Sequence, residues 1–333
     1  MQRRNIYINY TSLLVALLLF MVGCKKQDYA LPTPKDVLQN DVIKRTQGPN
    51  IVTQTIEFAY AMAILPSKGK LVSAEVEASI AGAPGTFLEN RSFFTKPNGA
   101  DSGVVVAQPS VTSGTKTTVT FNRDTSAATL RYFYVVPEGA RGKTVSFTFS
   151  AKSSNGETVS YKMGPYTVAK MDIVRNLVLS DSTGMIYISI QDLAIYNSAT
   201  AATKADRIDL VYLYRNITTS AFNHALVSPA ADTVYLPGIT LPAGVNRSTK
   251  EIKVFSLQDY NLAQLQYGIY IDDVDFQQLN FTSAPNYAIN LKAEAGVWVE
   301  TADGKYRAYI YINSVVNRAT NKSAVIGIKR YAL

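Results

Sequence analysis

From Ile51 to the C-terminus, the sequence is a series of short runs in which apolar and polar residues alternate, separated by clusters of Gly, Pro and Asn. Alternation with a period of two places the apolar side chains on one face of a β-strand. About seven such runs precede Gly164-Pro165, which is the strand number of an immunoglobulin-like domain, and a second series follows that pair. Apolar residues make up 47% of the chain, so there is enough apolar surface to form cores. The sequence therefore predicts a mostly β protein of tandem immunoglobulin-like β-sandwich domains.

Gly164-Pro165 interrupts the alternation and marks the predicted boundary between the two domains. We expect an N-terminal sandwich over residues 51–168 and a C-terminal sandwich over residues 171–333. One short helix is expected in the second domain, where Ser256-Leu257-Gln258-Asp259 is typical of a capping box. The paired cysteines of antibody domains are absent, because Cys24 is the only cysteine of the chain.

One hairpin of the first domain can be predicted to the residue. A two-residue Asn-Gly loop would mix polar and apolar side chains on each face, whereas a three-residue loop ending in a left-handed Gly156 would not. The longer loop collects apolar residues on one face, pairing Phe147 with Met163, Phe149 with Tyr161 and Ala151 with Val159. Because the buried face determines the register, we predict the longer loop.

A second hairpin, turning at Asp303-Gly304, provides the candidate ligand-binding surface. Its register sets Val297 opposite Ile310 and Val299 opposite Ala308 as the core face. The other face carries an aromatic pair, an ion pair and one further ring, namely Trp298 with Tyr309, Glu300 with Arg307, and Tyr311. Aromatic rings at a solvent-exposed face stack on sugar rings, with nearby charges as hydrogen-bond partners. Two interpretations remain open, a ligand platform or a face covered by another part of the chain.

Few residues in this chain indicate catalysis or metal binding. Three carboxylates that follow a predicted strand, Asp272, Asp273 and Asp275, could hold Ca²⁺, although they lack the Gly turn and distal Glu of an EF-hand and a solvated loop is the favoured explanation. The single histidine, His224, has no carboxylate near it in sequence. There is no G-x-S-x-G nucleophile motif and no marked pair of carboxylates for glycoside hydrolysis. We therefore expect a protein that is not an enzyme and has no cofactor, with Ca²⁺ the one candidate ion.

The first 24 residues have the features of a bacterial lipoprotein signal. Arg3 and Arg4 precede an apolar run from Leu13 to Val22, which is shorter than the about 20 residues that a transmembrane helix needs. Met21-Val22-Gly23-Cys24 resembles a lipoprotein cleavage box, with Met where Leu is usual. The alternative is an ordinary secretory signal with an incidental cysteine. On the lipoprotein interpretation Cys24 carries acyl chains that anchor the protein in a membrane, and residues 25–50 form a flexible tether.

The cleavage box, the tether and the two β domains together resemble outer-membrane lipoproteins of Bacteroidota. Segments such as Ala128–Pro137 and Tyr287–Gly296 are similar to uncharacterised two-domain β-sandwich families of that group. The resemblance implies a lipid-anchored protein of the outer membrane, exposed at the cell surface. The resemblance does not identify any functional residues in this chain.

Three functions remain open at this point. The first is a surface binding or adhesion protein for a glycan or a host or matrix protein. The second is a fimbrial subunit or anchor, with Arg45-Thr46 as a candidate processing site. The third is a glycoside hydrolase. Nucleic acid is not an expected partner, because the net charge of +8 is not concentrated in any dense Lys/Arg run.

Overall fold

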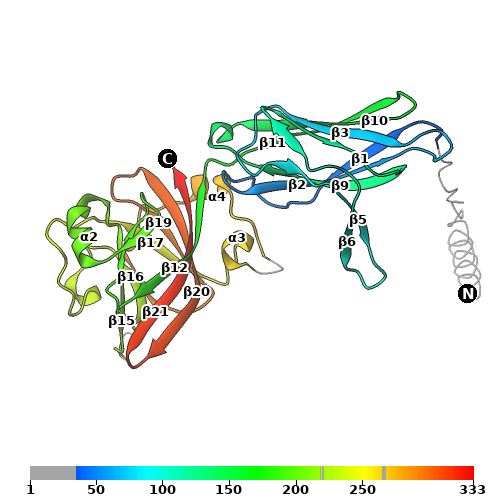
Figure 1. Cartoon of the computed structure of the whole chain (residues 1–333). Helices are drawn as coiled ribbons and strands as arrows, with labels where there is room; N and C mark the ends of the chain where they lie inside the picture. Colours follow the sequence, from blue (N-terminus) through cyan, green and yellow to red (C-terminus); the bar gives the residue numbers. More distant parts are fainter. Residues whose placement is uncertain (1–34, 218, 220, 265–267) are drawn as a thin grey trace, which may run out of the picture. The chain divides into compact units, whose positions relative to one another are not determined.

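The structure, a computed structural model, describes residues 35–217, 219, 221–264 and 268–333 (Figure 1). Residues 37–333 form one compact unit that is mostly β, with few short helices, and this confirms the predicted class of tandem β-sandwich domains. The signal peptide, Cys24 and residues 25–34 of the predicted tether lie outside the described residues. No helix in the described ranges has the length and apolar character needed to cross a membrane.

The N-terminal sandwich consists of two antiparallel sheets. The first has the order β1-β2-β9-β4, with bounds Gln39–Lys44, Thr55–Ala63, Ala127–Val135 and Phe87–Leu88. The second has the order β11-β10-β3-β8-β7, with bounds Thr158–Thr167, Thr144–Ser153, Leu71–Ala78, Lys116–Thr120 and Val111–Ser113. A separate hairpin of β5 (Arg91–Thr95) and β6 (Asp101–Val105) extends away from β9 in Figure 1.

Alternation along the strands forms the core of this sandwich. Every second residue of β2 and β9 is buried, and the rings of Phe58, Tyr132, Phe147 and Phe149 pack on one another between the sheets. The β10–β11 hairpin has the predicted register and three-residue loop, and Gly156 adopts a positive φ of 90°. The register was predictable because a one-residue slip would turn these apolar side chains to solvent.

Two expectations about the ends of this domain are wrong. Residues 39–44, placed in the tether, form strand β1, which pairs along its whole length with β2. β1 is an edge strand with Val42 as its one fully buried side chain, so its apolar signal is weak. Gly164-Pro165 does not break the sheet either, because β11 continues through this cis-peptide pair to Thr167. The predicted domain limits themselves stay a prediction.

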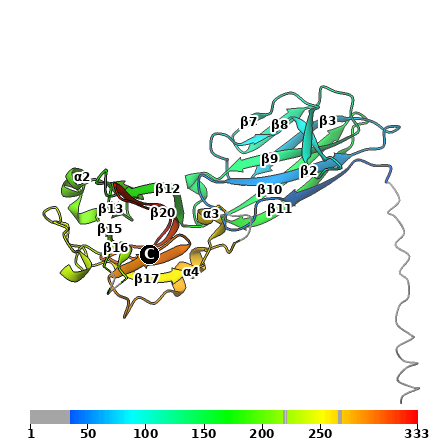
Figure 2. The ribbon, with the colours of Figure 1, turned by 90° about the horizontal axis from the view of Figure 1, so that it is seen from below.

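The C-terminal sandwich also has two antiparallel sheets. One has the order β12-β21-β20-β19-β17, with bounds Asp172–Ser180, Asn321–Ala332, Tyr306–Arg318, Ala295–Glu300 and Lys250–Phe255. The other has the order β14-β13-β15-β16-β18, with bounds Ala194–Tyr196, Tyr187–Ser189, Leu210–Arg215, Asn223–Val227 and Tyr287–Leu291. Its strands β13, β15 and β16 are labelled in Figure 2. Branched aliphatic side chains from both sheets form the core between them.

Helices are short and lie between the strands of this domain. The expected helix is α3 (Tyr260–Ala263), although its N-cap is Asp259 rather than Ser256. Two further helices, α2 (Ser198–Thr203) and α4 (Asp273–Gln278), escaped the sequence analysis. Each is capped by the side chain of the Asn or Asp that precedes it, which satisfies backbone N–H groups of its first turn.

Candidate functional site

The predicted register of the β19–β20 hairpin is confirmed. Trp298 lies opposite Tyr309, and Glu300 lies opposite Arg307. An ion pair joins the last two side chains, in which Nε and Nη2 of Arg307 each lie 3.0 Å from the same oxygen, Oε2 of Glu300. The five candidate ligand-binding residues therefore share one face of this sheet, as alternation predicts.

That face is covered, however, and the interpretation as a ligand platform is corrected. Trp298 is 7% exposed, and Tyr309 and Tyr311 are buried as well. Phe276 of α4 meets the Trp298 ring edge-on, with ring centroids 5.5 Å apart. Arg307 donates to the main-chain oxygens of Phe276 at 2.6 Å and of Gln277 at 3.2 Å, which holds α4 over the sheet. The alternative interpretation, a face covered by another part of the chain, is the one that the structure supports.

Tyr309 shows how closely this layer is packed. Its hydroxyl donates to the main-chain oxygen of Leu257 at 2.5 Å. A Cβ atom at Gly296 would lie 2.1 Å from the same hydroxyl oxygen, so any larger residue there would displace the ring. These rings have no solvent-exposed face on which a sugar could stack.

The three carboxylates proposed for Ca²⁺ are used by the backbone. Asp272 accepts from the N–H of Val274, and Asp275 accepts from the N–H of Asp272, which forms the capping box of α4. Asp273 accepts from the N–H groups of Lys170 and Met171 at 2.7 and 3.2 Å. No group of three or more potential ligands that could hold a metal occurs in the described ranges. The expected calcium site is therefore corrected to a helix cap.

His224 is a structural residue. It is buried in β16, and its Nδ1 atom shares a hydrogen bond of 2.7 Å with the hydroxyl of Tyr212. Burial lowers the pKa of His224 to about 4, so the ring is neutral at physiological pH. It lines none of the cavities described below.

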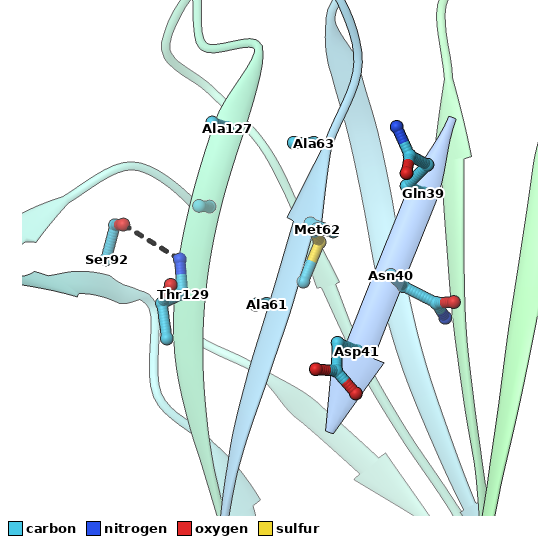
Figure 3. Close-up of a pocket in the computed structure, with 10 residues that line it drawn as sticks. Gln39, Asn40, Asp41, Ala61, Met62, Ala63, Ser92, Ala127 and Thr129 are labelled. Atoms are coloured by element: carbon cyan, nitrogen blue, oxygen red, sulfur yellow. Dashed lines mark hydrogen bonds between the residues drawn. The ribbon is translucent and has the colours of Figure 1, made fainter. Parts of the chain in front are cut away.

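A shallow, open concave surface lies on the outer face of the first sheet of the N-terminal domain (Figure 3). It is a cavity of about 480 Å³ between β1, β2, the start of β5 and β9. Its floor consists of small side chains from β2 and β9, namely Ala61, Ala63 and Ala127. Polar side chains surround the floor, with Gln39 and Asp41 on one side and Ser92 and Thr129 on the other (Figure 3).

A smaller cavity of about 90 Å³ shares Thr129 with the first. It is lined by aromatic and charged side chains that include Phe93, Phe94, Arg131 and Asp101. We call the residues lining the two cavities the hairpin groove, because the β5–β6 hairpin forms one wall of it. The Ser92 hydroxyl accepts from the N–H of Thr129 at 3.0 Å and so fixes that wall to β9.

Charge also holds the hairpin in place. The Arg131 guanidinium lies 4.3 Å from the centre of the Phe93 ring and forms an ion pair with Asp101. The Thr95 hydroxyl, which donates to Asp101, keeps the pKa of that carboxyl below its usual range. Two apolar side chains of the hairpin are exposed, Phe94 by 52% and Val104 by 44%, on the face that also carries Ser92 and Ser102. Apolar side chains gathered on a projecting element are typical of a binding surface.

The sequence analysis missed this groove. A signal was present, because Phe93-Phe94 is followed by Pro97-Asn98-Gly99 and then by Val104-Val105, which is a turn between two apolar runs. The alanine floor could not be predicted, because the sequence pattern does not distinguish alanines on the outer face of a sheet from other small residues.

Comparison with known proteins identifies the family of this chain. The sequence profile of a domain of unknown function, DUF4466, matches residues 35–168, and that of a second, DUF8576, matches residues 169–333. The crystal structure of a DUF4466 family protein from Parabacteroides merdae is 45% identical in sequence, with a TM-score of 0.83. That alignment covers 90% of this chain and 100% of the other. The chain belongs to the DUF4466 family.

More distant matches add little to the DUF4466 assignment. A fragment of the major pilin GBS80 of Streptococcus agalactiae aligns over 87% of this chain and 90% of its own, with 10% identity and a TM-score of 0.28. The fimbrial adhesin FimA of Actinomyces aligns over 87% and 96%, with 9% identity and a TM-score of 0.25. Similarity at this level carries no argument about function. No curated protein matches the sequence.

Proposed function

We propose that this DUF4466 protein is a lipid-anchored, non-catalytic binding protein of the cell surface, and that its hairpin groove captures a glycan or an extracellular protein. The observation that carries the proposal is the β5–β6 hairpin, which stands outside both sheets and exposes Phe94 and Val104. A two-stranded hairpin is marginally stable alone, yet this one is fixed to β9 by Arg131 and Ser92. Its exposed apolar side chains contribute nothing to the core of the sandwich.

The chemistry of the groove supports binding rather than catalysis. The alanine floor provides a flat apolar surface, and the amide of Gln39, the carboxylate of Asp41 and the hydroxyl of Thr129 provide hydrogen-bonding groups around it. Glycoside hydrolysis uses two carboxyl groups across the scissile bond, whereas Asp41 lines the larger cavity and Asp101, in the smaller one, is held in an ion pair with Arg131. Exposed Phe94 beside such a surface can stack on a sugar ring or pack on a partner protein.

The membrane anchor rests on the sequence. A signal of this kind ends at Cys24, and acylation of that residue would hold the N-terminal domain close to the outer membrane through the residues that precede β1. Placement on the cell surface then puts the groove where extracellular ligands are available.

The first test measures binding on cells. Bacteria displaying the wild-type protein should bind a glycan array or an array of matrix proteins, and Phe94→Ser should weaken the affinity for the captured ligand about tenfold. Val104→Ser should act in the same direction. Val178→Ser is the matched control, because Val178 is 55% exposed on β12 of the other domain. Cys24→Ser should release the protein from the cells while the released protein keeps its ligand.

Equal binding by the Phe94→Ser and wild-type proteins would remove the hairpin groove from the proposal. Retention of the Cys24→Ser protein in the outer membrane would remove the lipid anchor. The two parts of the proposal therefore fail independently.

A second candidate function, a fimbrial subunit, is favoured by one observation at β1. This edge strand ends at Lys44, and the next residue is Arg45. Cleavage after Arg45 would separate β1 from the domain and uncover the edge of β2, with its row of unpaired N–H and C=O groups. An uncovered edge of this kind pairs with a strand from another chain.

This candidate predicts controlled assembly. An arginine-specific protease should cut the folded protein after Arg45, whose side chain is 42% exposed, and the product should then form larger species in light scattering. Arg45→Gln should block both cleavage and assembly. Arg123→Gln, in another exposed segment, is the control and should leave both unchanged. A cleaved protein that stays monomeric would exclude assembly by strand exchange.

A further inference from the structure

The most unusual polar group of the C-terminal domain is a fully buried lysine. Lys329 of β21 is 0% exposed. Its Nζ atom lies 2.6 Å from Oδ2 of Asp259, 2.7 Å from the main-chain oxygen of Ile271 and 3.0 Å from Oδ1 of Asn261. Lysine is almost never fully buried unless it is paired. Nζ is thus held against both a carboxylate and a side-chain amide.

Hydrogen bonds hold the groups around Nζ in place, and the buried Lys329 and Asp259 meet a half-buried Asn261. Asp259 is also 0% exposed, and it accepts from the N–H of Leu262 at 3.0 Å and of Ile271 at 2.8 Å. Leu262 and Ile271 belong to the apolar cluster that covers the outer face of this sheet. Burial lowers the pKa of Lys329, which makes its neutral amine easier to reach. Asn261, which follows Asp259 by two residues, carries the amide on the same short segment as the carboxylate.

We propose that this cluster is a covalent modification site, at which Nζ of Lys329 and Cγ of Asn261 become joined by an isopeptide bond. A neutral amine is a nucleophile and an amide carbon is an electrophile, and burial of Lys329 and Asp259 limits the water that would compete at the amine. Holding two reacting groups in contact replaces a bimolecular encounter and so removes much of the entropic part of the barrier. This inference is independent of the proposed binding function.

The reaction balances without any co-reactant. Asp259 takes one proton from the Lys329 ammonium, which leaves the nitrogen with a lone pair. That lone pair forms the new bond to Cγ of Asn261, and the bond between Cγ and Nδ2 breaks. Nδ2, which already carries two hydrogens, takes up one proton from Nζ and one from Asp259 and leaves as ammonium. The carboxylate of Asp259 is regenerated, and nothing is oxidised or reduced.

The bond would tie the C-terminal strand to α3. The residues between Asn261 and Lys329 include β18 of one sheet and β19 and β20 of the other, so the cross-link closes a long segment that contributes to both sheets. Closing a long loop restricts the unfolded chain, as a disulfide does. Cys24 is the only cysteine, so this chain cannot form an internal disulfide. An isopeptide bond would give an extracellular domain that same restriction without any dependence on redox conditions.

Peptide mapping of the full-length protein by mass spectrometry tests the proposal. Trypsin cleaves after Lys and Arg, so an unmodified chain yields residues 254–292 and residues 323–329 as separate peptides. A cross-linked chain resists cleavage after Lys329, and its second peptide therefore ends at Arg330. We expect residues 254–292 joined to residues 323–330, at the sum of the masses of these two peptides less one ammonia. Separate peptides at their sequence masses, with no linked species, would overturn the proposal.

Variants assign the bond to its atoms. Lys329→Met and Asn261→Ala should each abolish the linked peptide, and Asp259→Asn should reduce it strongly because the proton acceptor is lost. Lys322→Met is the matched control, since Lys322 is a lysine of the same strand whose side chain contacts Asn317 instead; it should leave the loss of ammonia unchanged. A linked peptide that survives in Asn261→Ala would also overturn the assignment. The wild-type result decides the proposal even where a variant fails to fold.

Discussion

Replacing Glu251 with Gln should make the protein more stable at pH 8 and flatten the dependence of its stability on pH. Glu251 lies on β17 and is fully buried, and neither of its carboxyl oxygens has a hydrogen-bond partner among the described residues. Burial raises the pKa of Glu251 well above its usual value. An unsatisfied buried polar group costs about 1–3 kcal/mol, and a charged one costs more.

The sign of the pH dependence follows from proton binding. Above the ordinary pKa of glutamate, near 4.5, the unfolded chain releases this proton while the folded chain retains it. The folded state therefore binds more protons, and the free energy of unfolding falls as the pH rises. The stabilisation is fully present below the unfolded pKa and is lost as the pH rises towards the raised folded value. The amide of the Glu251→Gln variant does not titrate, so this contribution disappears.

Chemical denaturation at pH 5 and pH 8 measures the effect. The wild-type protein should lose more stability between these values than Glu251→Gln does, by about 1 kcal/mol or more. Burial also raises the pKa of Asp209, to about 6, but that contribution is common to both proteins and cancels in the comparison. Glu294→Gln changes an exposed carboxylate of the same domain, so its free energy of unfolding should change between pH 5 and pH 8 as much as that of the wild type. If the free energy of unfolding changes equally with pH in the wild type and in Glu251→Gln, then Glu251 is ionised and paired in the folded protein.

Local patterns predicted the fold where neighbours in sequence determine it. The hairpins at Gly156 and Gly304 have the predicted registers, because a turn and an apolar face restrict each pair of strands. β1 was missed because an edge strand buries few side chains, so its alternation is short. The three aspartates before and within α4 were interpreted as ligands, although Asp272 and Asp275 have the spacing of a capping box.

The site was harder to predict because burial is a long-range property. Alternation placed Trp298 and Tyr309 on the correct face, but that face is covered by α4 and by the segment around Leu257, neither of which belongs to the hairpin. Nothing in the hairpin sequence distinguishes a covered face from an exposed one. The hairpin groove is likewise formed by strands that are distant in sequence, β1, β2, β5 and β9.

The packing of Trp298 leads to the largest expected effect of a single substitution. Trp298→Ala should lower the free energy of unfolding by about 3–5 kcal/mol, as truncation of large buried aromatic residues generally does. The indole packs on Phe276 and lies 4.5 Å, centroid to centroid, from the Tyr309 ring. Removing it would leave a cavity beneath α4, and α4 would lose one of its apolar contacts with the sheet, while the stacking of Phe276 on Tyr331 would remain.

Thermal and chemical denaturation measure this loss, and a surface variant calibrates it. Phe255→Ala removes a ring that is 64% exposed on the adjacent strand β17, so its effect should stay within about 0.5 kcal/mol. The loss of stability in Trp298→Phe should lie between the losses in Trp298→Ala and Phe255→Ala, because a smaller ring fills part of the space. Ligand capture through the hairpin groove should survive Trp298→Ala wherever the protein is still folded, because Trp298 lines neither of its cavities. A midpoint near that of the wild type, combined with lost binding, would instead restore the aromatic face as a ligand platform and place the binding site in the C-terminal domain.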